Sequence, residues 1–135
     1  ADEIARTEGL VSVPPYDHPL IAAGQGTAGL ELLEDADLID RFYAPVSGGG
    51  LMAGCAVAIH ALSPRTEIIA VEPADGNDTL LSLAAGERRK VPPPRTIADG
   101  LRVRTPGELT WPVLQKHVAR VALVKSQISE LRPPR

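Results

Sequence analysis

The sequence predicts an α/β fold with a mainly parallel sheet and helices on both faces. Strand-like and helix-like segments alternate along the chain, which is the order of a layered α/β domain. The run Glu-Ile-Ile-Ala-Val at residues 67–71 is almost continuously apolar, as expected of a parallel strand covered on both sides. The chain has 135 residues, of which 44% are hydrophobic, and this is enough for one ordinary domain with a core.

The first two elements are marked by the residues that end them. Residues 1–8 form an expected helix, which Gly9 ends as a C-cap. The apolar residues 10–13 form an expected strand, which ends at Pro14 because proline donates no hydrogen bond to a strand ladder.

A longer helix is expected over residues 20–33, where apolar residues recur at helical spacing. It contains Gly24, Gly26 and Gly29, each of which weakens a helix by up to about 1 kcal/mol relative to alanine. Glycines in such a place indicate the close approach of another backbone or of a ligand.

The middle of the chain predicts two strand–helix units. Residues 41–46 form an expected strand, and the alanine-rich residues 51–62 form a buried helix that ends before Pro64. The strand at 67–71 is followed by a short helix over 79–85.

The last third of the chain begins with a basic, proline-rich loop at residues 87–97. A helix over 110–117 and a strand over 121–124 then continue the alternation. Ser126 is expected to cap one further helix.

Composition excludes several classes of function. The net charge is −3 and aromatic residues make up 3% of the chain, so nucleic-acid binding is not expected. No apolar stretch of the sequence is long enough to span a bilayer. The single cysteine, Cys55, allows neither an internal disulfide nor a multi-cysteine metal site, which favours a reducing compartment such as the cytoplasm.

Residues 47–50, Ser47-Gly48-Gly49-Gly50, form a glycine loop between an expected strand and an expected helix. Glycine permits positive φ and has no Cβ, so the N–H groups of such a turn can face one anion together with the positive helix end. A phosphate is the natural occupant of that position. The alternative is a tight turn that needs glycine only for its own geometry.

Local spacing leaves the identity of the phosphate open. The glycine loop is not a Walker A motif, because no Gly-Lys-Ser/Thr follows it. Gly48, Gly50 and Ala53 do match the dinucleotide pattern G-x-G-x-x-A, and Glu72 ends the next strand, where a ribose-binding acid belongs. A small phosphate- or NAD-binding module is therefore one hypothesis.

Four separated segments carry a more specific signal. They are Ala23-Gly24-Gln25-Gly26-Thr27, Pro45-Val46-Ser47-Gly48-Gly49-Gly50-Leu51, Val71-Glu72-Pro73 and Thr96-Ile97-Ala98-Asp99-Gly100-Leu101. Their order and spacing resemble the serine/threonine dehydratase and serine racemase family. The resemblance implies part of the large domain of a fold-type-II enzyme that uses pyridoxal 5′-phosphate, a small amino acid as substrate, and a homodimer when intact. Residues 1–135 would then be an incomplete cofactor-binding domain, without the small domain and the C-terminal part.

The resemblance also implies which residues hold the cofactor. In the family the glycine loop binds the cofactor phosphate, mainly through backbone N–H groups, and a later glycine passes close to the cofactor ring. Carried over, the binding residues are Ser47, Gly48, Gly49, Gly50, Leu51 and Gly100. Many relatives have glycine where Ser47 stands, and serine keeps the N–H group and adds a hydroxyl. Gly100 is alternatively a turn glycine.

A divalent cation site is implied in the same way. In racemase-like and catabolic relatives, residues matching Glu72, the carbonyl of Gly76 and Asp78 hold a cation. Such hard oxygen ligands suit Mg²⁺, Ca²⁺ or Mn²⁺. The alternative is an acidic surface loop in which Asp78 caps the next helix.

The implied reaction is the elimination of water from L-threonine or L-serine to give a 2-oxo acid and ammonia. It requires a lysine that forms a Schiff base with the cofactor. None of the three lysines, Lys90, Lys116 and Lys125, matches the family's Schiff-base motif. We therefore expect the catalytic lysine outside this chain, which alone would be inactive.

Several alternatives remain at this stage. Within the family, the protein could be a serine racemase or a hydroxyaspartate ammonia-lyase. From other classes come the NAD- or phosphate-binding module described above and a non-catalytic remnant that binds a partner chain.

Overall fold

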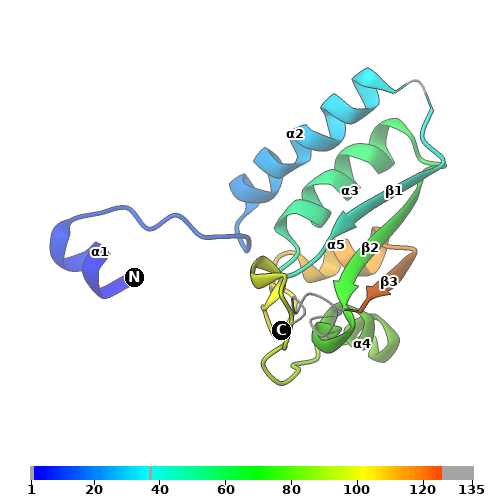
Figure 1. Ribbon diagram of the computed structural model, residues 1–135. Coiled ribbons are helices and arrows are strands. Elements are labelled where there is room, and N and C mark those ends of the chain that lie inside the picture. Colours follow the sequence, from blue (N-terminus) through cyan, green and yellow to red (C-terminus); the bar gives the residue numbers. More distant parts are fainter. Residues whose placement is uncertain (1, 37, 126–135) are drawn as a thin grey trace, which may run out of the picture.

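A three-stranded parallel sheet forms the centre of the fold, seen in a computed structural model that describes residues 2–36 and 38–125 (Figure 1). The strands β1 (Arg41–Pro45), β2 (Glu67–Pro73) and β3 (Arg120–Val124) lie side by side in that order. Both strand pairs are parallel. The predicted α/β class with a parallel sheet is thereby confirmed.

The helices follow the predicted segments closely. They are α1 (Asp2–Glu8), α2 (Pro19–Asp35), α3 (Gly50–Leu62), α4 (Asp78–Ala85) and α5 (Trp111–His117), with short 3-10 turns η1 (Ala74–Gly76) and η2 (Asp99–Leu101). Glycines in the left-handed region follow α1 and α4, at Gly9 with φ 66° and at Gly86 with φ 71°, as C-caps do. The expected cap at Ser126 lies outside the described residues.

The core lies between the sheet and the helices α3 and α5. The buried side chains of this core are Ala44, Val46, Met52, Cys55, Ala56, Ile59, Ile68, Ala70, Leu114 and Val118. Small residues on α3 allow the helix to approach the sheet, and the larger side chains of Met52 and Ile59 fill the remaining space. Cys55 is a buried core residue with 1% of its surface exposed.

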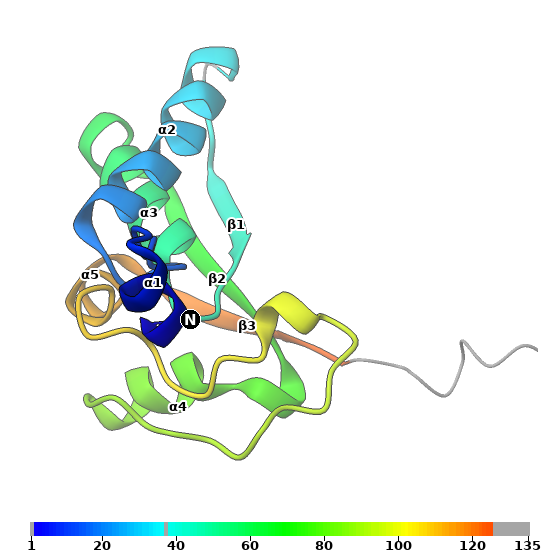
Figure 2. The same ribbon diagram turned by 90° about the vertical axis from the view of Figure 1, so that its left-hand side faces the viewer.

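The helices α2 and α3 lie side by side in both views of the fold (Figure 1 and Figure 2), and their backbones are in close contact. A Cβ built on Gly54 would collide with the carbonyl oxygen of Ala22, and one on Gly26 would lie 3.0 Å from the carbonyl oxygen of Gly54. Gly29 faces Cys55 in the same way, with 3.2 Å to its Cα. The close backbone approach predicted from the glycines of α2 is confirmed at Gly26 and Gly29, whereas Gly24 faces open space.

The predicted strand at residues 10–13 is wrong. This segment is an extended, exposed arm between α1 and the rest of the fold, and Val11 keeps 89% of its surface exposed (Figure 1). Alternating apolar residues favour a strand, but a strand forms only where a neighbouring strand accepts its hydrogen bonds. Within residues 2–36 and 38–125 this segment has no such neighbour.

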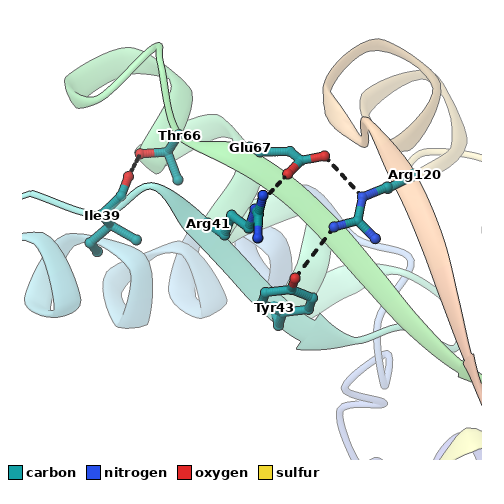
Figure 3. A network of polar contacts seen from close by, with 6 residues as sticks. All are labelled: Ile39, Arg41, Tyr43, Thr66, Glu67 and Arg120. Atoms are coloured by element: carbon teal, nitrogen blue, oxygen red, sulfur yellow. Dashed lines mark hydrogen bonds and ion pairs between the residues drawn. The ribbon is translucent and has the colours of Figure 1, made fainter.

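A polar network ties the three strands together near their amino ends (Figure 3). Glu67 of the central strand accepts from Nε of Arg41 on β1 at 3.1 Å and from Nε of Arg120 on β3 at 2.9 Å. Arg120 also donates to the hydroxyl of Tyr43 at 3.3 Å. Opposite charges on adjacent strands support the parallel register, in which Arg41 pairs with Glu67.

No helix in the described part of the chain combines the length and the apolar character needed to cross a membrane.

Candidate functional site

The glycine loop joins the end of β1 to the start of α3. Gly49 is the N-cap of α3 and has φ 96°, a left-handed conformation that favours glycine. The first helical hydrogen bond of α3 runs from the N–H of Ala53 to the carbonyl of Gly49 at 2.8 Å. The N–H groups of Gly50, Leu51 and Met52 precede that bond, so they have no acceptor within the helix.

A hollow of about 420 Å³ lies over the glycine loop. It brings the six predicted cofactor-binding residues together, although Gly100 is about fifty positions away from the loop in the sequence. The lining residues are Pro15, Tyr16, Gln25, Pro45, Ser47, Gly48, Gly49, Gly50, Leu51, Met52, Gly100, Leu101 and Val103. None of these lining residues is charged, so an anion there would be held by backbone and hydroxyl dipoles.

The hydroxyl of Ser47 is the second feature of this hollow. Its oxygen is buried and has no hydrogen-bond partner among the described residues. A buried hydroxyl without a partner costs about 1–3 kcal/mol, so such groups are rare unless a ligand or water satisfies them. Ser47 is one of the residues that line the hollow, and its unpartnered hydroxyl is therefore a candidate donor to a bound oxyanion.

Protein atoms occupy the places where Cβ atoms on the glycine loop would project. A Cβ on Gly48 would collide with the ring of Tyr16, and one on Gly49 would lie 2.8 Å from Oγ1 of Thr110. A Cβ on Gly50 would lie 3.0 Å from the backbone of Tyr16. The loop therefore needs glycine for its own packing, which agrees with the alternative of a tight turn. Binding of an anion is supported instead by the N–H groups at the start of α3 and by the hydroxyl of Ser47.

Sequence reasoning missed Tyr16 and Thr110 as parts of this site. Thr110 is fully buried and donates through Oγ1 to the carbonyl of Gly48 at 2.6 Å, across 62 positions of the chain. No spacing rule connects residues so far apart, and only the fold shows the contact. Tyr16 lies in the proline-rich loop before α2, where it resembled an ordinary turn residue.

The predicted cation ligands lie at the end of β2, where the chain turns through η1 into α4. Glu72 has 1% of its surface exposed and accepts from the N–H groups of Thr79 at 2.8 Å and Leu80 at 3.0 Å. Glu72 thus caps α4 from a distance. Its side chain is almost completely buried, whereas an acid that binds a ribose hydroxyl must be exposed to the nucleotide, which disfavours the dinucleotide hypothesis.

Asp78 is the second carboxylate of this acidic pair, Glu72 and Asp78. It is buried with 1% of its surface exposed, and its Oδ2 has no hydrogen-bond partner among the described residues. Burial, and secondly the charge of Glu72, raise the pKa of Asp78 to about 7. Burial also raises the pKa of Glu72. The alternative in which Asp78 caps α4 is wrong, since α4 has no side-chain cap bond at its N-cap and the capping carboxylate is Glu72.

Gly76, the third predicted ligand, is buried in η1 between the two acids of the pair. A Cβ there would lie 2.9 Å from the ring of Pro94. In the described part of the chain, no cluster of three or more His, Cys, Asp or Glu side chains is placed to hold a metal. The candidate set has two carboxylates and one backbone carbonyl, so it does not depend on such a cluster.

The lysines lie apart from the hollow over the glycine loop, whereas Lys125 lines a second hollow together with Glu72. Lys90, Lys116 and Lys125 are exposed, and none lines the hollow over the glycine loop. Their solvated positions agree with the expectation that the catalytic lysine is elsewhere, which stays a prediction.

Comparison with known proteins decides the family. The model of a family described as pyridoxal-phosphate dependent enzyme matches residues 1–129. The chain belongs to the pyridoxal-phosphate dependent enzyme family. Among curated members, it is 40% identical over 125 residues to an L-threo-3-hydroxyaspartate ammonia-lyase of Saccharomyces cerevisiae, covering 93% of this chain and 38% of that protein. It is 40% identical over 122 residues to a catabolic L-threonine dehydratase of Escherichia coli, covering 90% and 37%.

Solved structures of the pyridoxal-phosphate dependent family show the same fold. A maize serine racemase superposes with a TM-score of 0.88 at 41% identity, covering 93% of this chain and 38% of that one. A threonine deaminase from T.th. superposes with a TM-score of 0.90 at 43% identity, covering 94% and 44%. The chain thus spans less than half the length of the relatives it matches, and these neighbours are fold-type-II enzymes.

Proposed function

We propose that this chain is the phosphate-holding part of an enzyme that uses pyridoxal 5′-phosphate to eliminate water from L-threonine or L-serine. The products would be a 2-oxo acid and ammonia. The observation that carries the proposal is the buried, unpartnered hydroxyl of Ser47 beside the free N–H groups at the start of α3. Family membership supports the identity of the anion as the cofactor phosphate.

The residues of this chain would bind the cofactor and orient it. The N–H groups of Gly49, Gly50 and Leu51 and the hydroxyl of Ser47 donate to the phosphate, and the dipole of α3 adds about 0.3–1 kcal/mol. Gly100, on η2, also lines the hollow and has no side chain, and a Cβ built there would meet nothing within 4 Å, so this residue would leave space for the cofactor ring. When bound, pyridoxal phosphate supplies a ring that withdraws electrons from the substrate α-carbon.

The reaction type is supported by the relatives. Their names include threonine dehydratases, serine racemases and a hydroxyaspartate ammonia-lyase, all at about 40% identity. We assign dehydration of threonine or serine to this protein, with racemisation of serine and deamination of hydroxyaspartate as alternatives. All three reactions would require the same binding of the cofactor phosphate.

Borohydride reduction tests the proposal most directly. The protein is isolated from its source, reduced in the presence of pyridoxal phosphate, digested and mapped by mass spectrometry. We expect a phosphopyridoxyl lysine on a peptide outside residues 1–135. A label on Lys90, Lys116 or Lys125 would overturn the placement of the catalytic lysine. Absence of any label would favour a phosphate-binding module without this chemistry.

We also propose that Glu72, the carbonyl of Gly76 and Asp78 hold Mg²⁺, Ca²⁺ or Mn²⁺. The supporting observation is the unpartnered Oδ2 of a buried Asp78 next to a second buried acid, Glu72. Two buried carboxylates repel each other, and a cation between them would remove that cost.

Titration of the full-length protein with Mn²⁺, followed by electron paramagnetic resonance, tests the cation site. Asp78→Asn should weaken binding by at least about tenfold, the loss expected for one charged ligand. Asp75→Asn is the matched control, because Asp75 is an exposed acid in the same turn. Equal effects of the two substitutions would mean nonspecific attraction by an acidic loop.

We propose two further properties of the whole protein. Homodimer formation is supported by an apolar groove between α2, α3 and the residues around α5, where Val57 and Leu30 are 51% and 39% exposed. Analytical ultracentrifugation of the full-length protein distinguishes a dimer from a monomer.

A cytoplasmic location is supported by the single cysteine of the sequence, and fractionation of source cells tests it.

A further inference from the structure

The carbonyl of Gly48 is held by two donors from the other end of the chain. Oγ1 of Thr110 donates to it at 2.6 Å, and the N–H of Gly107 donates at 3.0 Å. Thr110 is fully buried and Gly107 is buried as well. Neither of these donors lines the hollow over the glycine loop. The oxygen of Gly48 is therefore fixed toward the protein interior.

Fixing this oxygen also fixes the next N–H group. The peptide between Gly48 and Gly49 is trans, as are all described peptides, so its carbonyl and its N–H point in opposite directions. With the carbonyl turned toward Thr110, the N–H of Gly49 is turned toward the hollow. A rotation of this peptide, which glycine permits at little cost, would present an oxygen to an anion there.

The side chain of Asp17 holds the segment that supplies these donors. Its carboxylate accepts from the N–H groups of Glu108 at 2.8 Å, Leu109 at 2.9 Å and Thr110 at 3.3 Å. Gly107 leaves room for this carboxylate, because a Cβ at that position would collide with Oδ1 of Asp17. The adjacent ring of Tyr16 packs on the glycine loop itself.

We propose that Thr110 and Asp17 are positioning residues for the cofactor phosphate. Thr110 orients the Gly48–Gly49 peptide so that its N–H faces the phosphate, and Asp17 holds Thr110 in place. Neither side chain touches the cofactor. The proposal rests on the proposed function, since it requires that the glycine loop binds phosphate.

Loss of this positioning should weaken the binding of pyridoxal phosphate but not of pyridoxal, which has the same ring and no phosphate. The test uses the full-length protein stripped of cofactor and titrated with each compound by absorbance. Thr110→Val removes the hydroxyl at nearly constant volume and should raise the Kd of pyridoxal phosphate by about tenfold, the loss of one buried hydrogen bond. The Kd of pyridoxal should change by less than about twofold. Thr110→Ser should restore the affinity.

Two further variants complete the experiment. Thr7→Val is the control for threonine substitution, because Thr7 is exposed and bonds only to its own helix. Asp17→Asn retains the size of the side chain and should give the same selective loss, which keeps the proposal testable if Thr110→Val does not fold. Melting temperature of the stripped protein identifies a variant that is merely unfolded.

The outcomes are distinguishable. A selective loss for pyridoxal phosphate in Thr110→Val or Asp17→Asn supports the proposal. Equal losses for both compounds, or no loss, would overturn it. If the unmodified protein does not prefer pyridoxal phosphate to pyridoxal, the proposed function itself fails, and the positioning role fails with it.

Discussion

Glu72 and Asp78 place two carboxylates in the interior at the start of α4, and the charge of Glu72 helps to raise the pKa of Asp78 to about 7. Glu72 is compensated by two backbone N–H groups, whereas Oδ2 of Asp78 has no hydrogen-bond partner in the described part of the chain. The cost of ionising this pair therefore falls mainly on Asp78.

This relationship predicts a pH dependence of stability in the absence of divalent cations. The pKa of Asp78 is about 7 in the folded state, above the ordinary value of 3.8 that applies to the unfolded chain. As pH rises from about 4 to about 7, the unfolded carboxyl ionises first, so the free energy of unfolding falls across this window and then levels off. Asp78→Asn removes the effect and should be more stable than the unmodified protein at pH 8, by about 1–3 kcal/mol.

Thermal melting in a chelating buffer between pH 4 and pH 8 measures the difference. The gap between Asp78→Asn and the unmodified protein should shrink as pH falls from 7 toward 4, because the carboxyl is protonated in the folded state and becomes increasingly protonated in the unfolded state. A variant that is less stable at pH 8 would show that the ionised carboxylate of Asp78 has a favourable partner in the folded protein, contrary to this prediction.

A second prediction concerns the glycine loop. Gly49→Ala places a Cβ at φ 96° and 2.8 Å from Oγ1 of Thr110, so it should lower the free energy of unfolding by about 1–3 kcal/mol. Gly100→Ala is the matched control, because its Cβ would meet nothing within 4 Å. We expect Gly100→Ala to retain stability in urea unfolding and, if the ring of the cofactor passes this residue, to weaken cofactor binding. Equal stability of the two variants would contradict the strain at Gly49.

A third prediction compares two glycines of the α2–α3 pair. Gly54→Ala should destabilise the protein by about 2 kcal/mol or more, because the new Cβ would collide with the backbone of Ala22 and neither helix can yield locally. Gly24→Ala faces open space in the interior of α2 and should stabilise by about 0.4–1 kcal/mol. Differential scanning calorimetry should show opposite signs for the two variants. The same sign for both would rule out the close packing.

A fourth prediction concerns the network on the sheet. Ion pairing with Arg120, and to a lesser extent with Arg41, lowers the pKa of Glu67. Its contribution to stability is therefore present at neutral pH and lost as pH falls below the ordinary range of a glutamate. Glu67→Gln should cause a small loss at pH 7 that disappears at acid pH and in high salt, because all three side chains are partly exposed. Chemical unfolding at two salt concentrations tests this, and a loss independent of salt would contradict it.

Local signals predicted those parts of the fold that depend on neighbouring residues. The glycine loop, the capping glycines and the buried strand β2 all have short-range signatures in composition or spacing. The strand expected at residues 10–13 was wrong because a strand also depends on a partner that local sequence does not supply.

Contacts across long stretches of chain were beyond sequence reasoning for the same reason. Asp17 and the turn at residues 108–110 lie about ninety positions apart in the sequence and meet only in the folded chain. The capping of α4 by Glu72 was missed because capping rules consider residues next to the helix, and Glu72 lies seven positions before Thr79.

The backbone contact between α2 and α3 has a consequence for motion. The backbones of α2 and α3 touch at glycine positions, where no flexible side chains lie between them to adjust if one helix shifts. We therefore expect the two helices to move as one body. The glycine loop begins α3, and it therefore cannot shift without carrying the seventeen residues of α2 with it. A conformational change in a longer protein that contains this chain would therefore move other parts around α2, α3 and the glycine loop, which would stay fixed relative to one another.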